Sequence, residues 1–219
     1  MANKIVWDAP TERVYENGVD HAVLYPVDPA LGTYPKGYAW NGITTITESP
    51  SGAEATPLYA DNTVYLNTIS LEKYGGTIEA YYYPEEFSLC DGTKSPVEGL
   101  HVGQQARAPF GLAFRTKMGN DAQGDGYGYK LVLVYGALVA PSEKTHSTVN
   151  DSPEVVTFSW TFSTTPVPLT GYNNTSVLTI DSTKIDSLKL AALEAILYGA
   201  IPATEGRLPL PAEVVTLLT

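Results

Sequence analysis

The strict alternation of large apolar and small hydroxyl side chains along residues 156–163 constrains the fold most strongly. The large members are Val156, Phe158, Trp160 and Phe162, and each is followed by Thr or Ser. A period of two places every large side chain on one face of a β-strand and every hydroxyl on the other. The segment therefore predicts a strand with one buried face, with Trp160 in the core and Thr161 outside it.

Further strands follow from similar patterns elsewhere in the chain. Residues 77–83 and 110–115 also alternate, whereas residues 131–139 (LVLVYGALV) are apolar nearly throughout, which predicts a strand covered on both faces. Shorter strands are predicted near residues 22–25, 38–47 and 63–67. Long connections rich in Pro and Gly separate them, at residues 26–37, 49–62, 84–109, 119–128 and 140–153. This spacing predicts a mainly β protein, a β-sandwich or barrel with long loops.

One C-terminal α-helix is predicted after the strands. Ser182 or Thr183 can cap its start, with Asp186 in capping-box spacing, and Gly199 ends it. Two apolar stripes make its apolar face wider than docking onto a single sheet requires, so the face is either a subunit interface or deeply buried in its own domain. Residues 208–211 (LPLP) are predicted to be extended. The expected organisation is a β domain at residues 1–181, followed by a helix and extended tail at residues 182–219.

Charge and cysteine content limit the compartment and the partners. The 219 residues carry a net charge of −11, which repels phosphate backbones and argues against reading nucleic acid. The single cysteine, Cys90, excludes an internal disulfide framework and fits a reducing cytoplasm. We see neither an apolar signal core at the N-terminus nor 18 consecutive apolar residues, so we expect a cytoplasmic product that does not insert into membranes.

A search for catalytic or ligand-binding patterns predicts none. The three histidines are scattered, and residues 121–126 (DAQGDG) open like a calcium loop but meet Val132 where its final Glu belongs. Glu85 and Glu86 follow Pro84 and match the acidic first turn of a short helix better than a catalytic pair. We therefore expect no enzyme activity, no metal and no cofactor.

Several long stretches, in order along nearly the whole chain, carry a family resemblance. They are residues 38–92 (YAWNGITTITESPSGAEATPLYADNTVYLNTISLEKYGGTIEAYYYPEEFSLCDG), residues 105–121 (QARAPFGLAFRTKMGND), residues 129–140, residues 155–164, and LAALEAILY at residues 190–198 followed by RLPLP. Together they resemble the major tail protein, the tail tube subunit, of bacteriophages with long non-contractile tails.

The resemblance implies a structural virion protein. Such subunits close into rings of six that stack into a tube around a tape-measure protein, with tail terminator and distal tail proteins at the two ends. Genomic DNA passes through the tube as cargo without specific binding. The implied location is the virion tail, assembled in the host cytoplasm.

Alternative functions remain open at this point. A carbohydrate- or receptor-binding β-sandwich module of a virion would use exposed aromatic rings, for which Trp7 and Trp40 are the candidates, and an enzyme of unrecognised type is a third possibility. For self-assembly, the expected interface residues are Leu58 and Tyr59, which end the small and polar run of residues 49–62, and Leu190, Leu193 and Leu197 of the helix.

Overall fold

The computed structural model describes residues 5, 7–146, 148, 155–200 and 204–219. Its main element is an eight-stranded antiparallel sheet in the order β2-β1-β9-β10-β11-β6-β3, with β12 paired to the other half of β10. The strands are β1 (Val14–Pro26), β2 (Tyr38–Ala39), β3 (Ile43–Glu48), β6 (Gly75–Ala80), β9 (Phe110–Asn120), β10 (Gly124–Val139), β11 (Phe158–Thr164) and β12 (Val177–Asp181). The predicted mainly β class is confirmed.

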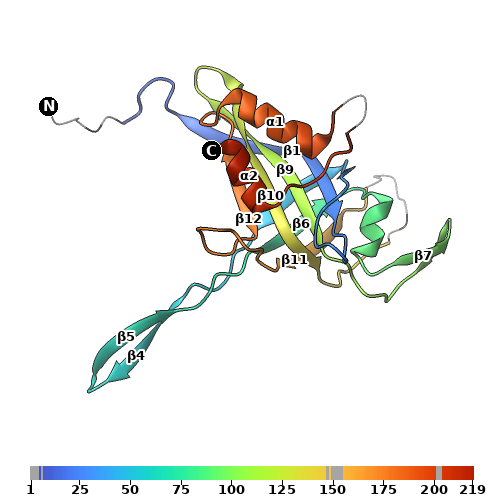
Figure 1. The fold of residues 1–219 in the computed structure, drawn as a ribbon, viewed down its shortest axis with the longest axis horizontal. Helices are drawn as coiled ribbons and strands as arrows, with labels where there is room; N and C mark the ends of the chain where they lie inside the picture. The colour runs from blue at the N-terminus through green and yellow to red at the C-terminus, as the bar shows by residue number, and fades with distance from the viewer. Residues whose placement is uncertain (1–4, 6, 147, 149–154, 201–203) are drawn as a thin grey trace.

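The sheet curls so that both of its ends meet in one stretch of chain, residues 38–48. β2 pairs with β1 through Leu24 and Tyr38, while β3 pairs with β6 through Ile46 and Ile78. The Trp40 amide between them donates to the Ala22 carbonyl at 2.8 Å. The strands therefore enclose one side of the sheet (Figure 1).

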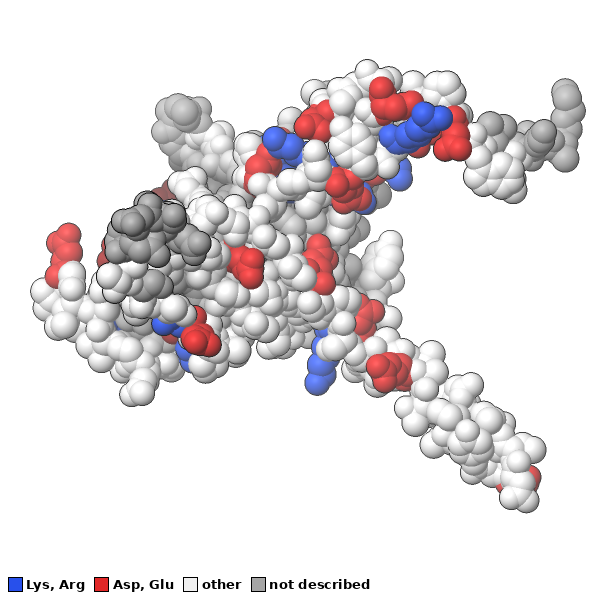
Figure 2. Space-filling model, turned by 180° about the vertical axis from the view of Figure 1, so that it is seen from behind, with Lys and Arg blue, Asp and Glu red and all other residues white. Residues whose placement is uncertain are grey.

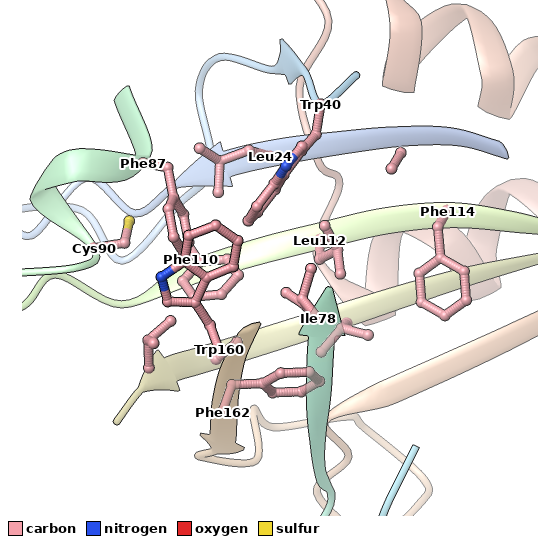
Figure 3. Close-up of a cluster of buried hydrophobic side chains, with 14 of the residues drawn as sticks. Leu24, Trp40, Ile78, Phe87, Cys90, Phe110, Leu112, Phe114, Trp160 and Phe162 are labelled. Atoms are coloured by element: carbon pink, nitrogen blue, oxygen red, sulfur yellow. The ribbon is translucent and has the colours of Figure 1, made fainter. Parts of the chain in front are cut away.

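The enclosed side holds a core of aromatic rings (Figure 3). Trp160 lies 5.7 Å from Trp40 and 5.1 Å from Phe87, centroid to centroid, and is fully buried. Phe162 is also buried and Thr161 is exposed, so the predicted faces of this strand are confirmed, although the strand begins at Phe158 rather than at residue 156. Burying rings of this size is the largest contribution that single side chains make to a core.

The opposite side of β9, β10 and β12 is covered by two helices, α1 (Ser187–Tyr198) and α2 (Pro211–Leu218), as Figure 1 shows. They form a second core with Leu131, Leu133 and Tyr135 of β10. The Tyr135 hydroxyl donates to the Pro209 carbonyl at 3.0 Å, and the Tyr25 hydroxyl donates to the Leu197 carbonyl at 2.8 Å. The prediction that residues 131–139 form a strand covered on both faces is thus confirmed for its buried stretch, residues 131–135.

The C-terminal segment differs from its prediction in two ways. Residues 211–218 form a second helix rather than an extended tail, because Pro211 occupies a first-turn position, where a missing amide costs nothing. The extended conformation is found only before it, at Leu210 (φ −67°, ψ 155°). Both helices share the second core with the sheet, and the division of the chain after residue 181 remains a prediction.

The start of α1 is also corrected. The Asp186 carboxylate, rather than Ser182 or Thr183, caps the helix by accepting from the amides of Leu188 at 2.9 Å and Lys189 at 3.2 Å. Asp181 instead engages the Thr183 amide and hydroxyl in a tight turn before the helix. Gly199, with φ of 82°, ends the helix as predicted.

The remaining elements lie outside the main sheet. A short 3-10 helix, η1 (Glu85–Leu89), carries Glu85 and Glu86 in its first turn, as expected. Two separate hairpins are formed by β4 (Ala55–Ala60) with β5 (Thr63–Ile69), and by β7 (Lys94–Val97) with β8 (Leu100–Val102). No helix among the described residues has the length and apolarity needed to cross a membrane.

Candidate assembly surface

The β4–β5 hairpin, residues 55–69, stands away from the rest of the protein (Figure 1). It continues the ribbon begun by β3 and β6. Ser51 and Lys73 pair between the two parts, with amide-to-carbonyl distances of 2.8 and 2.7 Å in the two directions. The hairpin is therefore joined to the body by paired backbone.

A tight turn closes the far end of the hairpin. Asp61 and Asn62 lie between the paired residues Ala60 and Thr63, and both have positive φ, 50° and 62°. Two positive φ values define a type I′ turn, whose twist matches that of the flanking strands and which favours Asp and Asn. The Thr63 hydroxyl adds a bond to the Ala60 carbonyl at 3.2 Å. The prediction that residues 49–62 form a connecting loop is wrong, because residues 55–60 are a strand and residues 61–62 are its turn.

Every residue of β4 and β5 is exposed, although many are large and apolar. The large exposed members are Leu58, Tyr59, Val64, Tyr65, Leu66 and Ile69. Within residues 55–69 the one charged residue is Asp61 at the tip, and Figure 2 shows the projecting hairpin as mostly uncharged. An isolated two-stranded hairpin has marginal stability in water, and apolar patches of this kind mark interaction sites.

The predicted interface residues fall into two groups. Leu58 and Tyr59, with 46% and 71% of their surface exposed, are accessible to a partner, and their role remains a prediction. Leu190, Leu193 and Leu197 are buried against the sheet of their own chain. Their assignment to a subunit interface is wrong, because the side chains that such an interface needs are already covered by the second core.

Four apolar residues of the same surface were missed: Val64, Tyr65, Leu66 and Ile69. The signal for them was present as Asp-Asn between two runs rich in β-branched and aromatic residues, which indicates a hairpin with a two-residue turn. We predicted a strand near residues 63–67 but assigned its partner to a loop.

A cluster of polar and charged side chains connects α1 to the sheet. Arg115 of β9 lies 3.1 Å from the Asp20 carboxylate and 3.6 Å from that of Glu194, and its guanidinium stacks 4.6 Å from the centre of the Tyr129 ring. Burial alone would raise the pKa of Asp20, but hydrogen bonds from Arg115 and His21 outweigh it, and this pKa is lowered. The Tyr129 hydroxyl donates to Glu194 at 2.8 Å, and burial followed by this bond raises the pKa of Tyr129 to about 12. Every acidic group of the cluster thus has a partner within the chain, which indicates a structural role.

The structure also places other side chains that could carry catalytic or metal-binding chemistry. Among the described residues no three His, Cys, Asp or Glu side chains converge as a metal site would require. The Ser95 hydroxyl and a ring nitrogen of His101 are 2.8 Å apart on the exposed β7–β8 hairpin. In a catalytic pair a third group hydrogen-bonds the other ring nitrogen and so orients the imidazole. Among the described residues no group forms that bond with His101. Burial, with a smaller contribution from Asp91, raises the pKa of the Cys90 thiol to about 12, which keeps the thiol protonated.

The two tryptophans predicted as candidates for sugar binding lie in different environments. Trp40 is buried, with its indole nitrogen donating to the Tyr82 carbonyl at 2.9 Å, so its proposed role as a sugar platform is wrong. Trp7 is exposed on the N-terminal arm. A pocket of about 520 Å³ does lie beside the stacked rings of Tyr82 and Tyr83, with Glu85, Glu98 and Lys144 at its edge.

Neither a protein-family model nor a curated protein sequence matches this chain significantly. The resemblance to phage tail tube subunits along nearly the whole chain therefore remains a prediction. The hairpin surface is the feature on which a function can be argued.

Proposed function

We propose that this protein is a structural subunit that assembles with copies of itself, as a tail tube subunit does. The observation that carries the proposal is the β4–β5 hairpin, which exposes apolar side chains that the chain's own core leaves uncovered. Exposure of these side chains to water is unfavourable, and burying them against a partner removes that free-energy cost.

The distribution of charge supports self-association in particular. Each copy carries a net charge of −11, so two copies repel each other. The hairpin carries only Asp61, so it can approach another copy with little electrostatic repulsion. The second core supports the proposal in another way. It buries the leucines of α1, so of the two predicted interface segments only the hairpin exposes its apolar side chains.

In the tube that the resemblance implies, copies close into rings of six and stack around a tape-measure protein, with terminator and distal proteins at the ends. DNA passes along the interior without a binding site, since the cationic contacts that hold phosphate backbones are outnumbered by acidic groups. We expect no measurable affinity for duplex DNA at physiological salt, measured in a salt titration.

Electron microscopy and sedimentation at rising protein concentration test the proposal. Rings or tubes should form from the purified chain, with or without the tail completion factors. A chain that stays monomeric at about millimolar concentration with those factors present contradicts the proposal, since even weak specific contacts are populated there.

The pocket beside Tyr82 and Tyr83 favours a second candidate, a carbohydrate- or receptor-binding module. Stacked tyrosine rings and nearby carboxylates can bind a sugar by its apolar face and its hydroxyl groups. Ligand-observed NMR with a panel of oligosaccharides tests it. Binding that is lost in Tyr82→Ala, by a chain that remains monomeric, would favour this function over assembly.

A further inference from the structure

Both faces of the β4–β5 hairpin carry large apolar side chains, and the two faces point in opposite directions. Leu58 pairs directly with Leu66, so these two side chains share one face, here called the leucine face. Tyr59 pairs with Val64, and Ala55 pairs with Ile69, on the opposite or tyrosine face. All five of the large side chains among them are exposed.

The body part of the same ribbon has the opposite character. In β3 and β6 one side carries Ile46 and Ile78 toward the core. The other side carries Thr45 and Thr47, which are exposed, and their partners Glu79 and Thr77. That alternation is what one buried face requires. The hairpin lacks this alternation, since large apolar side chains are exposed on both of its faces.

The adjacent residues Leu58 and Tyr59 therefore cannot both contact one flat surface. A hairpin lying on a single neighbour would bury one face and leave the other in water, with either two leucines or Tyr59, Val64 and Ile69 still exposed. The register shift after Leu58 adds Tyr65 as an unpaired residue that is 76% exposed, which enlarges the apolar surface further. Only contact on both sides removes the whole surface from water.

We propose that the hairpin of one copy inserts between two other copies of this chain, with its leucine face against one and its tyrosine face against the other. The inference rests on the proposed self-assembly. A copy is a suitable occupant because the hairpin is almost free of charge, and because the body carries an apolar groove of about 420 Å³ between β12 and α2, lined by Ile180, Val214 and Leu218 among others. Hairpin and groove lie in different parts of the chain, so such contacts are heterologous and continue from copy to copy.

Photo-crosslinking in assembled protein tests the number of neighbours. A small fraction of labelled chains carries a photoreactive phenylalanine analogue at two positions and co-assembles with an excess of unmodified chains. With the analogue in place of Leu58 and Tyr59, on opposite faces, irradiation should give covalent products of three chains. The matched control has it in place of Leu58 and Leu66, both on the leucine face, and should stop at two chains.

Polar substitutions provide an independent measurement. Leu58→Ser with Leu66→Ser, and separately Tyr59→Ser with Val64→Ser, should each raise the concentration needed for assembly about tenfold or more. If only one pair has this effect, one face is dispensable and the inference is wrong.

The outcomes separate this inference from the function on which it rests. Assembled protein in which opposite-face probes yield only two-chain products, or no crosslink between chains, overturns the double insertion while self-assembly stands. An unmodified chain that never assembles overturns the proposed function and the inference together. Three-chain products from opposite faces, with two-chain products from the control, establish it.

Discussion

The β3–β6 pair and the β4–β5 pair are two parts of one antiparallel ribbon, yet they exist in opposite environments. In the body, Ile78 is completely buried in the core of aromatic rings, whereas in the hairpin Tyr59 is 71% exposed. The backbone pairing is the same in both, through Ser51 and Lys73 at their junction. The difference shows that strand pairing is a local property, whereas stability comes from what the side chains bury.

The largest effect should come from alkaline pH, which acts on the body. Burial raises the pKa of the Tyr25, Tyr74 and Tyr135 hydroxyls above their usual value of about 10. The folded chain thus keeps protons that the unfolded chain releases, so stability is complete below about pH 10 and is lost as pH rises further. Near-ultraviolet circular dichroism during a pH titration should show cooperative unfolding. Stability that is unchanged up to about pH 12 would contradict this linkage.

Truncation of the central aromatic ring should have the next largest effect. Trp160→Ala removes a completely buried side chain and should lower the free energy of unfolding by about 3–5 kcal/mol in a urea titration. Thr161→Val, at the exposed neighbouring position, is the control and should change it by less than about 0.5 kcal/mol. Equal effects of the two changes would contradict the assignment of the two strand faces.

The helix leucines separate burial within the chain from a role between chains. Leu193→Ala should cost the free subunit about 2–5 kcal/mol, because Leu193 is completely buried in the second core. Leu188→Ala, on the same helix but 79% exposed, should cost about 0.5 kcal/mol or less. Thermal unfolding of the monomer measures both. If Leu193→Ala leaves the free energy of unfolding unchanged, burial within the chain is contradicted and a role of these leucines between subunits is favoured.

The smallest effect is expected in the hairpin. Tyr65→Ser should leave the free energy of unfolding of the monomer within about 0.5 kcal/mol, because this side chain is 76% exposed and contributes little to either core. The same variant should weaken assembly, so monomer stability and sedimentation of the assembled protein must be measured together. A clear loss of monomer stability would show that the hairpin belongs to the folding unit of the body.

Much of the body could be predicted because the residues that the hydrophobic pattern places on one face are the residues that the structure buries. Alternation along residues 156–163 placed Trp160 and Phe162 inside, and Gly199 ended the predicted helix. The errors arose where two structures satisfy one pattern. A wide apolar helix face fits a partner subunit or a second core, and only the position of α1 over β10 distinguishes them. Pro211 likewise permits both a chain that stays extended and a first helical turn.

The sequence by itself determined the local conformations: strands of period two, the end of α1 at Gly199, and the tight turn at Asp61 and Asn62, whose signal was present although we had assigned these residues to a loop. These depend on dihedral preferences and on side-chain spacing within a few residues. The tertiary structure alone decided which apolar residues are covered, because burial depends on segments that are distant in the sequence. It covered Leu190, Leu193 and Leu197 with the sheet, enclosed Trp40 in the core of aromatic rings, and left Leu58 and Tyr59 exposed on opposite faces of the hairpin.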